Sequence, residues 1–126
     1  MIGIDIVSHK RIEKVFNRFK HEFLRKIYTE NEIEYCLSKK SFVECLSARF
    51  AAKEACIKAI YQYCSVRLEM KQIEICGKRN EGATIRIYSD KLDTSSLQIL
   101  LSISHEKEYS VAVVLINTNS LEKGGN

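Results

Sequence analysis

The sequence is poor in glycine, with five, and contains neither proline nor tryptophan. Gly3 and Gly77 are isolated and Gly124–Gly125 lies in the tail, so the chain has neither a Walker A loop nor a dinucleotide-binding loop. It has no apolar run of about eighteen residues, which excludes a membrane-spanning helix. Its first residues lack the basic start, apolar stretch and small-residue cleavage site of a signal peptide. We therefore expect a cytoplasmic protein with no membrane partner.

The cysteines also lack the spacing of a cysteine site. There are five, an odd number, widely separated and without a C-x-x-C pair. Zinc sites and disulfide frameworks need paired or closely spaced cysteines, so we expect reduced, buried thiols. The five are Cys36, Cys45, Cys56, Cys64 and Cys76.

The composition is that of one ordinary globular domain. The chain has 126 residues, 45% hydrophobic and 29% charged. The net charge of +4 is too small to name a partner, but it is concentrated between His9 and Lys26, where seven basic residues face two acidic ones. Such local positive charge favours an anionic partner, which could be an acidic protein, a nucleic acid or a phosphorylated ligand.

The first third of the chain predicts a strand and two helices. Residues 2–7 are apolar and mostly β-branched around one carboxylate, which predicts a buried strand. Apolar residues at helical spacing over 9–26, with a basic stripe beside them, predict an amphipathic helix. Thr29 followed by Glu32 is typical of a capping box, and it predicts a second helix that runs to about Leu37.

From residue 42 onward, a long helix is followed by strands. The segment 42–62 carries apolar residues at helical spacing and five alanines, whose small size lets another backbone approach closely. Beyond it the pattern alternates, which predicts strands. Residues 106–108 would join the last two as a hairpin loop, and 90–97 could hold a helical turn. The predicted strands are 71–76, 83–88, 98–104 and 109–116, with a turn at 77–82 after the first.

These elements describe an α+β fold with one early strand, a helical middle and then a largely antiparallel sheet. No repeat, low-complexity tract or interdomain linker interrupts the chain. We predict a single domain over residues 1–117 and a frayed C-terminal tail over 118–126.

Four residues could carry chemistry. Asp5 lies among apolar residues, where an ionised carboxylate needs a cation, a metal or several donors, although an edge strand could also turn it to solvent. Glu54 and Lys58 lie four apart, hence on one helix face. They could form a surface ion pair, or hold a divalent ion and a phosphate respectively. His105 ends a strand before the hairpin loop, a position where a histidine is more often a surface residue than a catalytic one.

Three segments in this order resemble a known family. GIDIVSHKRI at 3–12, ARFAAKEACIKAI at 48–60 and SISHEKEYSVAVV at 102–114 resemble the signature segments of the holo-acyl-carrier-protein synthases. These enzymes are the small, single-domain branch of the 4′-phosphopantetheinyl transferases. The resemblance spans about residues 2–116 and implies their fold, with a largely antiparallel sheet, a long central helix and shorter helices. Residues 61–65 depart from the family, which commonly has a Gly-rich turn there.

The resemblance implies roles for particular residues. Asp5 and Glu54 would hold Mg²⁺ against the pyrophosphate of coenzyme A, and Lys58 would approach the phosphates. His105 would lie near the cofactor, with Arg49 beside the same site. The catalytic set is therefore Asp5, Glu54, Lys58 and His105.

The resemblance also implies partners. The family places its active sites between the subunits of a homotrimer. An acidic apo-acyl carrier protein would dock on the basic helix, whose carrier-binding residues would be Arg11, Lys14 and Arg18.

The implied reaction transfers 4′-phosphopantetheine from coenzyme A to a carrier-protein serine and releases adenosine 3′,5′-bisphosphate. Phosphoryl transfer depends mainly on positioning the reacting groups and on neutralising the negative charge of the phosphate oxygens. Glu54, directly or through a metal-bound water, or His105 could accept the serine proton. Two alternatives are a basic nucleic-acid-binding module and a catalytically degenerate relative that only binds coenzyme A. We expect no nucleic-acid partner, because Phe16 and Phe19 suit the core better than base stacking.

Overall fold

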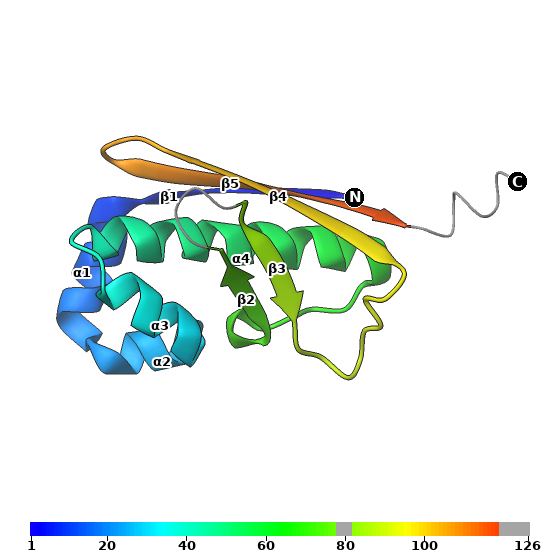
Figure 1. Ribbon diagram of the computed structural model, residues 1–126, viewed down its shortest axis with the longest axis horizontal. Helices are drawn as coiled ribbons and strands as arrows, with labels where there is room; N and C mark the ends of the chain where they lie inside the picture. Colours follow the sequence, from blue (N-terminus) through cyan, green and yellow to red (C-terminus); the bar gives the residue numbers. More distant parts are fainter. Residues whose placement is uncertain (78–81, 119–126) are drawn as a thin grey trace, which may run out of the picture.

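The computed structural model describes residues 1–77 and 82–118, and it confirms the α+β fold (Figure 1). A three-stranded antiparallel sheet lies over one long helix, and three shorter helices gather near the start of that helix. No helix in these two ranges is long and apolar enough to cross a membrane. In chain order the elements are β1 (Ile2–Ser8), α1 (His9–Phe19), α2 (His21–Ile27), α3 (Glu30–Leu37), α4 (Phe42–Cys64), the 3₁₀ turn η1 (Met70–Gln72), β2 (Ile73–Cys76), β3 (Thr84–Ile87), β4 (Leu97–His105) and β5 (Tyr109–Thr118).

The large sheet has the strand order β1-β5-β4, while β2 and β3 form a separate antiparallel pair. The 106–108 loop joins β4 to β5 as predicted. The segment 90–97 contains two turns and no helix, so the helical turn considered there is wrong. Most of the predicted turn at 77–82, and the tail from 119, lie outside the described residues.

The strand β1 packs directly against α4 through small residues. A Cβ atom placed on Gly3 would overlap the carbonyl oxygen of Ala55 and lie 3.1 Å from the amide nitrogen of Ala59. Only glycine leaves room for this approach, which sets the next inward-facing residue, Asp5, beside the helix.

The prediction of a buried strand at 2–7 is therefore right for one face only. Residues facing α4 alternate with Ile2, Ile4 and Ile6, which are 54%, 59% and 64% exposed. In a strand, successive side chains point to opposite faces, so an all-apolar strand covered on one side must present its other side outward.

The single helix predicted over 9–26 is wrong, because the chain breaks at Lys20. Lys20 has a positive φ of 49°, ends α1 and precedes α2. The break lets Phe16 pack edge-to-face on Phe42, with ring centroids 5.1 Å apart, while Phe23 turns toward Tyr28. Phe19, expected in the core, is 45% exposed.

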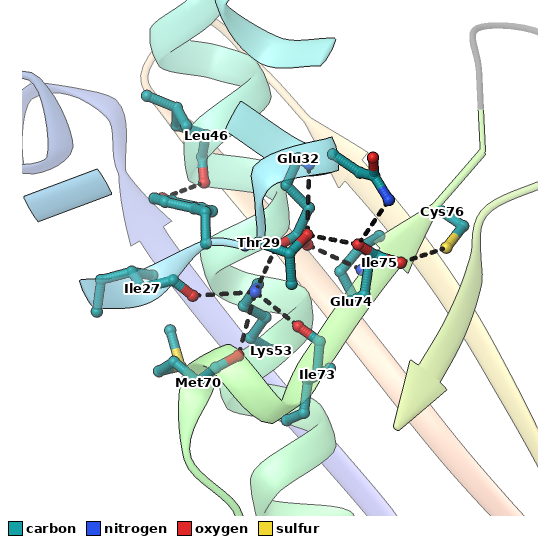
Figure 2. Close-up of polar contacts among 12 residues, drawn as sticks. Ile27, Thr29, Glu32, Leu46, Lys53, Met70, Ile73, Glu74, Ile75 and Cys76 are labelled. Atoms are coloured by element: carbon teal, nitrogen blue, oxygen red, sulfur yellow. Dashed lines mark hydrogen bonds and ion pairs between the residues drawn. The ribbon is translucent and has the colours of Figure 1, made fainter. Parts of the chain in front are cut away.

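The predicted capping box of α3 is confirmed, and its glutamate has a second role (Figure 2). Glu32 accepts hydrogen bonds from the amides of Thr29 and Ile75, both at 2.8 Å, and its carboxylate lies 2.5 Å from the Lys53 ammonium. Both side chains are fully buried.

Lys53 is held by backbone as well as by charge. Its Nζ donates to the carbonyl oxygens of Ile27, Met70 and Ile73 at 3.0, 3.1 and 2.6 Å (Figure 2). Burial lowers the pKa of Lys53, and the neighbouring Glu32 carboxylate opposes that effect. One ammonium thus joins the end of α2, the η1 turn and β2 to the middle of α4.

Candidate functional site

The structure brings Asp5 and Lys58 together. The Lys58 ammonium lies 3.1 Å from Asp5 Oδ1 and donates to the carbonyl oxygen of Ile4 at 2.9 Å. Asp5 faces the helix with its side chain 20% exposed, so the alternative of a solvent-facing aspartate is wrong. Lys58 therefore pairs with the strand rather than serving only as a helix-surface partner of Glu54.

Glu54 is the third member of this cluster. Burial raises its pKa, the nearby Asp5 carboxylate raises it further, and Lys58 partly opposes both effects. Two carboxylates thus lie near one ammonium, which pairs with Asp5 and only partly offsets the negative charge.

This donor set fits a magnesium ion. Mg²⁺ is commonly held by one or two carboxylates, and substrate phosphates and waters supply its other ligands. The residues in the described ranges contain no group of three histidine, cysteine or acidic side chains arranged as metal ligands. Asp5 and Glu54 could hold Mg²⁺ only together with such outside ligands.

His105 and Arg49 line a different part of the molecule. They share a cavity of ≈ 650 Å³ between the start of α4, the end of β2 and the strand β4. His105 Nδ1 lies 3.5 Å from Glu44 Oε1, and both side chains are partly exposed. Lys39 and Ser41 add a further cation and a hydroxyl group to the lining.

Arg49 is buried in the wall of this cavity, with 9% exposure. Its guanidinium lies over the Tyr35 ring, 4.6 Å from the centroid, and its Nη2 donates to the Gly77 carbonyl oxygen at 3.4 Å. Its Nε has no hydrogen-bond partner among the described residues. Burial lowers the pKa of Arg49, and nearby acidic groups, Glu32 first, oppose this. A cation in the wall of the cavity can attract an anion that enters it.

No hydrogen bond or ion pair among the described residues joins these two groups. Glu44 precedes Glu54 by ten residues, about 15 Å along the helix axis. Glu44, the partner of His105, lies in the first turn of α4, whereas Glu54 lies in the middle of that helix. The Asp5–Glu54–Lys58 cluster and the Arg49–His105 cavity are the two candidate half-sites.

The predicted carrier-binding residues lie on the outer side of α1. Arg11, Lys14 and Arg18 are all exposed. The Arg18 guanidinium lies over the exposed Phe19 ring, 5.1 Å from its centroid. This surface combines positive charge with one apolar contact.

Comparison with known proteins decides the family. The family model described as the 4′-phosphopantetheinyl transferase superfamily matches residues 1–114. The chain belongs to this superfamily. It is 42% identical over 122 residues to the holo-[acyl-carrier-protein] synthase of Aquifex aeolicus (strain VF5), covering 95% of this chain and 100% of the relative. For the holo-[acyl-carrier-protein] synthase of Hydrogenobaculum sp. (strain Y04AAS1) the identity is 46% over 121 residues, covering 92% and 94%.

Solved structures agree with this assignment to the 4′-phosphopantetheinyl transferases. The Helicobacter pylori holo-[acyl-carrier-protein] synthase in complex with coenzyme A matches with a TM-score of 0.75 and 36% identity, over 93% of this chain and 100% of that chain. The Bacillus anthracis synthase in complex with CoA (3′,5′-ADP) matches with a TM-score of 0.75 and 32% identity, over 93% and 95%. The family resemblance and the transferase fold are confirmed.

Two features of this transferase-family chain were missed from the sequence. Cys36 and Cys45 form a disulfide, so the expectation of five reduced thiols is wrong. These cysteines are nine residues apart, and only the antiparallel return from α3 to α4 brings their Cα atoms to 5.4 Å. Cys56, Cys64 and Cys76 are free, and burial raises the pKa of the Cys56 thiol to about 12.

His9 is the second missed feature. Its ring contacts the Lys107 carbonyl oxygen at 2.9 Å and the Ser110 hydroxyl at 2.8 Å, and its backbone amide donates to the Glu108 carbonyl oxygen. It therefore fastens the loop after His105 to the start of α1. All three partners lie about a hundred residues away, so no local sequence pattern could have indicated them.

Proposed function

We propose that this chain transfers 4′-phosphopantetheine from coenzyme A to a serine of an apo-acyl carrier protein in the cytoplasm. The reaction would depend on Mg²⁺ and release adenosine 3′,5′-bisphosphate. The observation that carries the proposal is the cluster where β1 packs on α4, in which Lys58 pairs with Asp5 and Glu54 lies close enough for both charges to affect its pKa. Mass spectrometry of an apo-carrier protein incubated with the enzyme, Mg²⁺ and coenzyme A tests it: the carrier should gain one phosphopantetheine group, and an unchanged mass would reject the proposal.

The charged cluster supplies what phosphoryl transfer needs. Asp5 and Glu54 would hold Mg²⁺, which when bound adds positive charge at the pyrophosphate oxygens. Within the described residues, Lys58 uses two of its three donors, on Asp5 and Ile4, and the third can donate to a phosphate oxygen. Either Glu54 or His105 would accept the proton of the attacking serine.

The cavity suits the nucleotide end of coenzyme A. Arg49 and Lys39 would bind its phosphate groups, and His105 would add a hydrogen bond or a charge. The position of Arg49 supports this role, because a nearly buried guanidinium in a cavity wall favours an anionic ligand.

We further propose a homotrimer with active sites between subunits. The sheet face turned away from α4 is apolar and open, since Leu100 and Leu115 are exposed beside the three isoleucines of β1. A patch of this kind normally marks an interaction site. Assembly would also bring the cavity of one protomer to the Asp5–Glu54–Lys58 cluster of the next.

Mixing two inactive variants tests the shared site. Glu54→Gln and His105→Ala proteins, each of low activity alone, should regain about a quarter of the wild-type rate when refolded together in equal amounts. One interface in four then has an intact half-site from each protomer. Carrier modification by mass spectrometry gives the rate.

The matched control mixes Glu54→Gln with Asp5→Asn. Both changes affect the same half-site of one protomer, so no interface is repaired and the mixture should stay inactive. If the first mixture merely averages the two single-variant rates, the active site is formed within one chain.

The exposed face of α1 would receive the acidic carrier protein. Charge reversal of Arg11, Lys14 and Arg18 to glutamate should raise KM for the carrier at least about tenfold and change kcat by less than about threefold, because the contacts act in docking. Lys91→Glu, an exposed charge in the β3–β4 connection, is the control and should leave KM unchanged. Equal effects of both variants would indicate general electrostatic attraction rather than a docking surface.

A further inference from the structure

A disulfide and a buried cation share one wall of the cavity. The disulfide joins Cys36, in the last turn of α3, to Cys45, in the first turn of α4. Cys36 is fully buried, whereas Cys45 is partly exposed and lines the cavity. The bridged segment also contributes Lys39 and Ser41 to the lining. Cys45 is therefore the end of the disulfide that borders the space a ligand would occupy.

The disulfide also touches Arg49. Arg49 Nη1 donates to Cys45 Sγ at 3.4 Å, and the guanidinium lies over Tyr35, the residue before Cys36. Its Nη2 is fixed on the Gly77 carbonyl oxygen, which leaves the buried Nε without a partner in the described part of the chain. The orientation of the guanidinium thus depends on Cys45 itself and on Tyr35, the neighbour of Cys36.

We propose that Cys36–Cys45 is a reversible thiol–disulfide exchange site for low-molecular-weight dithiols, and that its redox state controls how tightly the cavity binds phosphorylated nucleotides. The ligand class rests on the proposed function above. The exchange chemistry and the position of the disulfide do not depend on it.

The exchange begins at Cys45, the partly exposed cysteine of the pair. A thiolate of the dithiol enters the cavity and attacks Cys45 Sγ, forming a mixed disulfide, while the electron pair of the broken bond leaves on Cys36 Sγ and takes up a proton. The second thiol of the reductant then attacks the reductant's other sulfur atom, the one bonded to Cys45 in the mixed disulfide. This step releases Cys45, which takes up a proton and also becomes a thiol. The protein disulfide is reduced by two electrons, and the dithiol is oxidised to its own disulfide.

The other cysteine that lines the cavity, Cys76, does not compete. Burial, with a contribution from nearby Glu74, raises the pKa of Cys76, which keeps it protonated and a poor nucleophile.

Opening the bond changes the cavity wall. Two thiols need a separation well above the roughly 2 Å of a disulfide, so the Cys36 and Cys45 side chains must rotate apart, and the end of α3 is no longer bonded to the start of α4. Arg49 then loses its fixed neighbours at Cys45 and Tyr35, and the segment with Lys39 and Ser41 is no longer closed by a covalent bond. A binding site whose cation is less well oriented binds its anion more weakly.

The test measures thiol content and ligand affinity on the same samples. The probe is adenosine 3′,5′-bisphosphate, because coenzyme A carries a thiol that could itself react. The untreated protein should show three titratable thiols when denatured, and five after dithiothreitol treatment. Calorimetry should show affinity for the probe about tenfold weaker in the reduced protein, and oxidised dithiothreitol should restore it.

Matched serine variants complete the test. The Cys36→Ser/Cys45→Ser protein should bind the probe with the affinity of the reduced form, with or without reductant, while Cys64→Ser should respond as the parent does. Five thiols before reduction, or equal affinity in both redox states, would overturn the proposal. If neither state binds the probe while carrier modification proceeds, the control of nucleotide binding is rejected and the proposed transfer stands. If the probe binds in a redox-dependent way but no carrier is modified, the proposed transfer fails and the exchange site stands.

Discussion

Glu54→Gln should abolish phosphopantetheinyl transfer, with a rate at least about 1,000-fold lower, equivalent to about 4 kcal/mol of transition-state stabilisation. The amide keeps the size of the side chain but removes the charge that a hard divalent cation requires. The fold should not suffer. Burial and Asp5 raise the pKa of Glu54 above its unfolded value, so its ionised form costs stability at neutral pH, and a neutral amide removes that cost. Carrier modification followed by mass spectrometry, together with thermal unfolding, measures both effects.

The matched control is Glu34→Gln, an exposed glutamate on α3 outside both half-sites. It should leave the transfer rate unchanged. An unaltered rate in Glu54→Gln would remove Glu54 from the mechanism, and a large loss of stability in that variant would mean that its lost activity reports unfolding rather than chemistry.

Lys53→Met should lower the free energy of unfolding by about 3–5 kcal/mol, the largest stability effect we expect from a single charge. It leaves the Glu32 carboxylate fully buried without its cation, and it leaves three backbone carbonyl groups without their shared donor. Denaturant unfolding at one fixed protein concentration measures the loss, since assembly would otherwise contribute to it.

Two variants separate charge from packing. Lys58→Met, on the same helix, removes a half-exposed ammonium and should cost less than about 1 kcal/mol. Adding Glu32→Gln to Lys53→Met should recover part of the lost stability, because the buried charge disappears while the amide oxygen can still accept a hydrogen bond. Strictly additive losses would contradict a specific ion pair between Glu32 and Lys53.

The largest expected effect on activity and the largest on stability come from two adjacent residues, Glu54 and Lys53. The sequence alone distinguished their roles poorly. In the stretch ARFAAKEACIKAI, Lys53 and Glu54 both look like charges in an alanine-rich helix. A rotation of about 100° per residue turns one into the core, toward Glu32, and the other toward Asp5. Only the packing of α3 and β2 on one side of α4, and of β1 on the other, gives these neighbours a structural and a candidate catalytic position.

The sequence by itself determined the features that depend on short-range physics. The Thr29–Glu32 capping box, the long helix from residue 42 and the hairpin after His105 follow from local hydrogen bonding and from the periods of helix and strand. Asp5, Glu54 and Lys58 could be selected because a carboxylate amid apolar residues and a charged pair one helical turn apart are visible along the chain.

Only the tertiary structure decided which residues meet across long separations. It broke the basic helix at Lys20 because aromatic rings on both sides of the break had to reach the core, and it turned the isoleucines of β1 outward because α4 covers only one face of the sheet. It paired His105 with Glu44 rather than with Asp5, and it joined Cys36 to Cys45. These contacts depend on how whole helices and strands pack. The free energy that stabilises this packing comes from many residues far apart in the sequence, so no local pattern indicates it.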